Sequence, residues 1–98
     1  MGWTVIKIDE HGQEEKKLSS DFEIRNFDNL DPGDFKLIKY LDPYGDSTFG
    51  RTQFDDLTSD LRQLEKLGQV NKKQMGELLG LIYECKKDVH TYLKFFGD

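Results

Sequence analysis

The fold is decided by residues 52–89, TQFDDLTSDLRQLEKLGQVNKKQMGELLGLIYECKKDV. Apolar residues recur in this stretch at steps of three and four, the spacing that places side chains on one face of an α-helix. Two amphipathic helices are predicted, and each needs a partner surface because its apolar stripe is unstable when exposed to water. The expected stripe residues are Phe54, Leu57, Leu61 and Leu64 in the first helix, and Met75, Leu78, Leu79, Ile82 and Val89, with Tyr83 beside them, in the second.

Start and stop signals separate the two helices. Thr52 is a candidate N-cap for the first helix, and Gly68 stands where that helix is expected to end. Asn71 is the candidate N-cap of the second helix. Gly76 and Gly80 lie four residues apart inside the second helix, so they share one face, on which another backbone has room to approach closely.

Short strands are predicted on both sides of the helical stretch. The first alternates in sequence and is rich in β-branched residues, and the turn His11-Gly12 leads into its return strand. Another hairpin is expected around the turn residues 42–46, DPYGD. Asp31 is a candidate cap for a single helical turn that begins at Pro32. The expected strands are residues 3–9, 13–18, 22–25, 35–41, 47–51 and 92–96.

These elements predict a single α+β domain spanning residues 1–98. We expect an antiparallel sheet of about four or five strands with the two amphipathic helices packed on one face. The last strand is expected to return to the sheet. The alternative, if residues 35–41 are helical, is a mainly helical domain with a small hairpin.

Acidic residues are concentrated in one part of the chain. The net charge is −5, yet residues 35–98 contain ten acids and ten bases, and the acidic excess lies in residues 9–34, with nine acids and three bases. Such a surface repels nucleic-acid phosphate and anionic lipid and attracts basic partners, so neither a nucleic acid nor a membrane is expected as a partner. The competing interpretation is that the excess serves only solubility.

The sequence contains no recognisable catalytic, cofactor or metal site. Cys85 falls beside the apolar stripe of the second helix and is interpreted as a small buried hydrophobe. His11 and His90 are too far apart to pair as metal ligands. We therefore expect a protein that is not an enzyme and needs no cofactor. A single cysteine and the lack of a signal peptide or long apolar run favour a cytoplasmic location.

Residues 40–49, YLDPYGDSTF, and the closing residues 92–98, YLKFFGD, resemble a pattern in small uncharacterised bacterial proteins. In those proteins a PYGDT-x-F turn precedes a Q…L…EL…L helix, matched here at Gln53, Leu57, Leu61 and Leu64, and the chain closes on YLKFIGD. This chain departs by the insertion of Ser47 and by Phe96 in place of isoleucine. Such proteins are similar to immunity proteins found beside bacterial toxins. The resemblance implies a small acidic binding protein and transfers no functional residue.

Charge and resemblance together predict an acidic immunity-type inhibitor that binds a cognate toxin through a basic surface of that toxin. The alternative is a structural or regulatory protein that acts through self-association or through a helix-face interaction. For the inhibitor, the candidate partner-binding residues are the acids of the acidic segment and two aromatic anchors: Glu14, Glu15, Asp21, Phe22, Glu23, Phe27, Asp28, Asp31 and Asp34.

Overall fold

A five-stranded antiparallel sheet forms one layer of the protein. The computed structural model describes residues 1–97. Along the sheet the order is β2-β1-β5-β4, and β3 pairs with the start of β1. The strands are β1 (Gly2–Ile8), β2 (Glu14–Lys17), β3 (Phe22–Glu23), β4 (Asp46–Phe49) and β5 (Tyr92–Phe96). The predicted α+β fold, the first hairpin and the returning last strand are confirmed, with β5 between β1 and β4.

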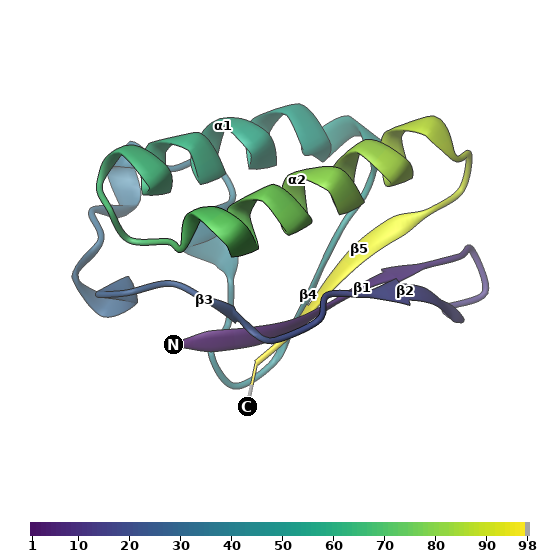
Figure 1. The fold of residues 1–98 in the computed structure, drawn as a ribbon, viewed down its shortest axis with the longest axis horizontal. Coiled ribbons are helices and arrows are strands. Elements are labelled where there is room, and N and C mark those ends of the chain that lie inside the picture. Colours follow the sequence, from purple (N-terminus) through teal and green to yellow (C-terminus); the bar gives the residue numbers. More distant parts are fainter. Residues whose placement is uncertain (98) are drawn as a thin grey trace.

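Two helices, α1 (Phe54–Lys66) and α2 (Lys72–Lys87), cover one face of this sheet (Figure 1). Side chains alternate along a strand, and in β1 the residues Trp3 and Val5 are buried. Leu93 and Phe95 of β5 are buried in the same way. The core therefore forms between the sheet and the apolar stripes of both helices. Neither helix among the described residues is long and apolar enough to cross a membrane.

The observed helix boundaries confirm two of the three residues predicted to cap or end the helices. The Asn71 side chain accepts hydrogen bonds from the backbone N–H groups of Lys73 and Gln74, at 2.8 and 3.2 Å, so it caps α2. Gly68 follows α1 with φ +71°, a left-handed conformation that glycine adopts without steric cost. Thr52 is not a cap, because it lies inside the short 3-10 helix η4 (Arg51–Gln53) that precedes α1.

The apolar stripe predicted for the second helix extends too far at its C-terminal end. Val89 lies beyond α2, which ends at Lys87, and its exposed fraction is 63%. Tyr83 is on α2 but points to solvent, with 61% of its surface exposed. The remaining stripe residues named above are buried, apart from the half-buried Leu79.

Residues 35–41 do not form the predicted strand. They contain the 3-10 helix η3 (Ile38–Tyr40), so the predicted second hairpin does not form and β4 pairs with β5 instead. The reason lies in α1, where the Asp60 side chain is only 3% exposed. Its carboxylate accepts the backbone N–H groups of Lys36, Leu37 and Ile38 at 2.6–3.0 Å. Donors held by a carboxylate cannot enter a strand ladder.

Candidate protein-binding surface

The nine predicted partner-binding residues do not form one surface. The β1–β2 hairpin, with Glu14 and Glu15, lies at one end of the 35 Å long axis (Figure 1). Residues 26–34, with Phe27, Asp28, Asp31 and Asp34, lie at the opposite end (Figure 1). A partner that contacts one end directly therefore cannot use the acids of the other end in the same small interface.

At the hairpin end, charges are engaged within the fold. Lys7 points into the helix-covered face, with 7% of its side chain exposed, and its Nζ lies 2.5 Å from an Asp88 oxygen and 3.4 Å from a Glu15 oxygen. The hydrogen bond to Asp88 is the main reason that the pKa of Lys7 is raised above its usual value. Lys16 pairs with Glu84 of α2 at 2.9 Å. Both Glu14 and Glu15 are exposed on the edge strand β2, and of the two only Glu15 forms an ion pair within residues 1–97, with the buried Lys7.

The middle group lies on β3, and one of its assignments is wrong. Phe22 is fully buried, so it belongs to the core and is not a surface anchor. Its neighbours are exposed: Asp21 immediately before β3 and Glu23 within it. Glu23 lies 3.5 Å from the N-terminal ammonium, and Asp21 accepts a hydrogen bond from the Thr4 hydroxyl at 3.1 Å.

At the other end, three aspartates face solvent. Asp28, Asp31 and Asp34 are exposed, and none has an ion-pair partner among residues 1–97. Asp31 accepts the backbone N–H of Gly33 at 2.9 Å and caps the 3-10 helix η2 (Pro32–Asp34), as predicted for a turn that begins at proline. Their negative charge therefore remains available to a partner.

A pocket of about 300 Å³ with a mixed apolar and polar lining opens beside these aspartates. Its walls include two core side chains, Phe35 and Ile38, which are 4% and 1% exposed. Phe27 is half-buried and packs edge-to-face on Trp3, with ring centroids 4.9 Å apart. The remaining lining residues are Leu30 and Pro32, with the charged Asp28 and Lys39.

Most of this pocket was absent from the sequence prediction. Of its lining residues, only Phe27 and Asp28 were among the candidates. Leu30 precedes the breaker cluster at 31–34, and Phe35 and Ile38 lie in residues 35–41, which were predicted to form a strand. A cluster of apolar residues around Pro and Gly was the one available signal, and it is equally typical of an ordinary buried loop.

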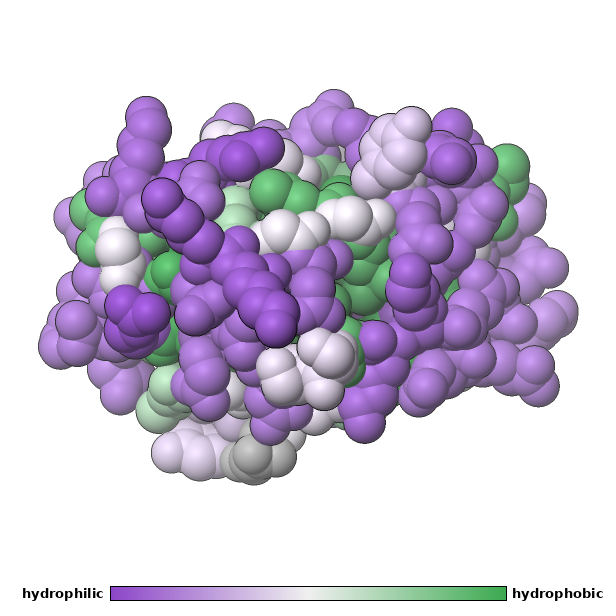
Figure 2. Space-filling model, in the orientation of Figure 1, coloured by the Kyte–Doolittle hydropathy of each residue, from purple (hydrophilic) through white to green (hydrophobic). Residues whose placement is uncertain are grey.

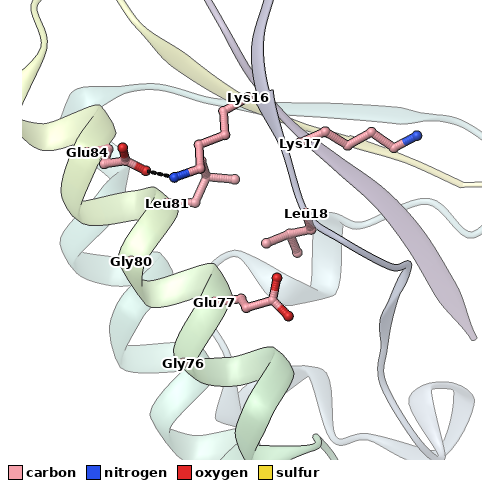
Figure 3. A pocket seen from close by; sticks show the side chains of 8 residues that line it. All are labelled: Lys16, Lys17, Leu18, Gly76, Glu77, Gly80, Leu81 and Glu84. Carbon is pink, nitrogen blue, oxygen red and sulfur yellow. Dashed lines mark hydrogen bonds and ion pairs between the residues drawn. The ribbon is translucent and has the colours of Figure 1, made fainter.

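A second hollow lies between α2 and β2. Figure 3 shows it lined by Gly76 and Gly80 of α2, with Leu18 and Leu81 beside them and the Lys16–Glu84 ion pair crossing one end. Its volume is about 380 Å³. No described atom outside the local helix backbone lies within 4 Å of the position that a Cβ would take on either glycine, so the backbone approach predicted for this face does not occur within the chain.

The face of the molecule seen in Figure 2 is mostly hydrophilic, with small apolar patches between the hydrophilic side chains. Cys85 of α2 is buried, as predicted, and burial raises the pKa of its thiol. A thiol with a raised pKa is mainly protonated at neutral pH and is a poor nucleophile. Within residues 1–97, no group of three or more His, Cys, Asp or Glu side chains is placed to hold a metal ion.

Comparison of the chain with protein-family models, with curated proteins and with solved structures found no match. The surface described above therefore carries the functional argument.

Proposed function

We propose that this protein is a non-enzymatic binding module, an acidic immunity-type inhibitor that captures a basic bacterial toxin. The observation that carries the proposal is the surface at residues 27–39, where a pocket with partly apolar walls opens beside Asp28, Asp31 and Asp34. We name this surface the pocket end. Four of the nine predicted residues belong to the pocket end: Phe27, as the apolar contact, and Asp28, Asp31 and Asp34.

Electrostatics supports this use of the pocket end. Carboxylates without a partner in the chain attract a basic surface from a distance and raise the rate of encounter. The apolar walls of the pocket at the same place supply the short-range contact that charged residues alone do not provide. Acids at the hairpin end contribute to the overall field, but Glu15 is already engaged with Lys7.

The test is capture from a lysate of the source organism on the immobilised protein, with elution by a salt gradient. We expect one basic protein in a one-to-one complex that is released at high salt, because screening weakens exposed charge pairs. The captured protein should arrest growth when it is expressed alone and not when both proteins are expressed. A captured protein that is harmless by itself contradicts the inhibitor function.

Two matched variants locate the binding surface. The triple substitution Asp28→Asn, Asp31→Asn and Asp34→Asn removes three charges at the pocket end and keeps an oxygen that can cap η2. The control, Asp9→Asn, Glu10→Gln and Glu14→Gln, removes three charges at the hairpin end. We expect the first variant to weaken capture at least about tenfold and the control about threefold or less. Equal effects would assign the attraction to net charge.

The second candidate function, self-association or a helix-face partner, is favoured by the exposed surface of α2. Gly76 and Gly80 leave a hollow there, and Tyr83 is 61% exposed. Glycine inside a helix lowers stability by about 1 kcal/mol relative to alanine, and this fold has room for alanine at both positions. The two glycines thus lower stability, although no packing contact within the chain requires glycine at either position.

Alanine substitution separates the two candidates. Gly76→Ala and Gly80→Ala are each expected to raise the free energy of unfolding by about 0.5–1 kcal/mol, measured by urea denaturation. Gly68→Ala is the control and should lower it, because its φ of +71° disfavours any side chain. If α2 is an interface, the double alanine variant will also dissociate the complex in analytical ultracentrifugation. An unchanged, concentration-independent monomer mass removes self-association as a function.

A further inference from the structure

The pocket at the pocket end is held open by the fold itself. Phe35 and Ile38 are core residues, and the backbone between them is fixed by the Asp60 carboxylate, which accepts N–H groups from Lys36 to Ile38. On the opposite wall, the Phe27 ring is held against Trp3. A cavity with walls of this kind needs little reorganisation to accept a ligand, which lowers the entropic cost of binding.

The interior of the pocket suits an apolar group. Its inner walls are aromatic and aliphatic, and its charged lining residues, Asp28 and Lys39, are exposed. Across residues 1–97, every buried side-chain nitrogen or oxygen already has a hydrogen-bond partner. An apolar group can therefore contact the aromatic and aliphatic walls without separating a buried polar side chain from its hydrogen-bond partner. An aliphatic or aromatic side chain gains free energy by leaving water.

The surroundings of the pocket select the charge of whatever carries that group. Asp31 and Asp34 flank Pro32 and Phe35 in the chain, and Asp28 lines the opening. Lys39 is the one base that lines the pocket, and its Nζ lies 5.3 Å from the centre of the Tyr40 ring. Residues 27–39 carry three acids and two bases, Lys36 and Lys39, a net charge of −1. Lys36 is paired with Asp56 of α1, so the unpaired charges at this end are mainly negative and favour a segment that carries lysine or arginine.

We propose that the pocket walled by Phe27, Leu30 and Phe35 receives one apolar side chain from a basic segment of the partner protein. This inference rests on the proposed binding function and specifies its contact. A volume of about 300 Å³ lies at the lower limit of the roughly 300–1,000 Å³ of small-molecule sites, and is adequate for a single side chain. The apolar side chain provides affinity, and the flanking bases provide orientation and rate of association.

Defined peptides test this contact without the natural partner. Three acetylated and amidated pentapeptides, KRLRK, KRARK and EDLDE, are titrated into the isotope-labelled protein and followed by NMR. KRLRK should shift the amide signals of residues 27–38, and KRARK should bind there at least about tenfold more weakly, because alanine buries less apolar area. EDLDE should cause no shift there. Equal affinities of KRLRK and KRARK would overturn the inference, and so would an absence of shifts at about 5 mM KRLRK.

A pocket-filling variant separates this inference from the proposed function. Leu30→Phe places a larger side chain in the half-buried wall and changes no charge. We expect it to weaken both KRLRK binding and partner capture at least about tenfold. If Leu30→Phe lowers the melting temperature strongly, the comparison of KRLRK with KRARK on the native protein, which needs no variant, decides the inference.

Failure of the inference and failure of the proposed function give different results. If the triple aspartate variant loses the captured partner and the pocket-filled variant keeps it, the binding function stands and the pocket contact is wrong. If neither variant affects capture, the proposed use of the pocket end is itself wrong. Loss of binding in both variants, with the hairpin-end control unchanged, supports both.

Discussion

The two ends of the molecule use their acidic residues differently. At the hairpin end, Glu15 and Asp88 contact the buried Lys7, and Glu84 pairs with Lys16. At the pocket end, Asp28 and Asp34 have no ion-pair partner among the described residues. The number of acids in a segment therefore sets only an upper limit on the charge that a partner can use, because some of them are already paired within the fold.

The physical reason for the difference is the position of a single lysine. Lys7 occupies an inward-facing position of β1, so its ammonium needs an anionic partner close by. Strand β2 and the end of α2 supply these partners. The pocket end consists of short 3-10 helices that bury no cation, so its aspartates remain directed to solvent.

The largest expected effect comes from the carboxylate that shapes the pocket end. Asp60→Ala leaves the N–H groups of Lys36, Leu37 and Ile38 without an acceptor, and should lower the free energy of unfolding by about 3–5 kcal/mol. Asp60→Asn keeps one acceptor oxygen and should cost about half as much. Urea denaturation measures both. A loss below about 1 kcal/mol for the alanine variant would show that Asp60 does not organise this end.

The hairpin end should respond less and in a pH-dependent way. Lys7→Met removes the cation, and we expect the melting temperature to fall by about 4–8 °C near neutral pH, with the exposed carboxylates screened by solvent. The pKa of Lys7 is raised and that of Asp88 is lowered, in both cases chiefly by their mutual hydrogen bond. The stabilisation is therefore present between the two unfolded-state pKa values.

The sign of the pH dependence follows from these shifts. As pH falls through the lowered pKa of Asp88, below 3.8, the pair loses its negative partner. As pH rises through the raised pKa of Lys7, above 10.5, it loses its cation. The difference in melting temperature between the native protein and Lys7→Met should be flat from about pH 5 to about pH 9 and should shrink on both sides. A difference that is constant at all pH values would assign the role of Lys7 to packing.

The smallest effect on stability is expected for the aspartates of the pocket end. Asp28→Asn combined with Asp34→Asn should change the free energy of unfolding by no more than about 0.5 kcal/mol, because neither carboxylate has an ion-pair partner within residues 1–97. Thermal and urea denaturation measure it. A cost above about 1 kcal/mol would mean that these aspartates serve the fold, as those at the hairpin end do.

Sequence periodicity predicted the regular elements well. Both helices, the first hairpin and the closing strand follow from local spacing and from caps such as Asn71 and Gly68. These features depend on residues within a few positions of one another, so they can be read along the chain. The α+β class follows from them, because amphipathic helices beside short strands need a sheet to cover.

The conformation of residues 35–41 and the make-up of the candidate site could not be predicted from local sequence patterns, because both depend on contacts between distant parts of the chain. Residues 35–41 are apolar enough for a strand, but their N–H groups bond to Asp60, more than twenty positions further along the chain. Phe22 alternates correctly for a strand, and only the packed structure assigns it to the core. The grouping of Phe27 with Phe35 and Ile38 around one pocket likewise arises from tertiary packing.

Both helices, the first hairpin, the class of fold and the total charge could be predicted from the order of residues alone, since each of these is a sum or a short-range pattern of residues. Tertiary structure alone decided which acids pair, which aromatic side chains are buried and where a cavity opens. Ion pairs and pocket walls join residues that are distant in the chain, such as Lys7 and Asp88. Their energies depend on distance in space, which the order of residues does not specify.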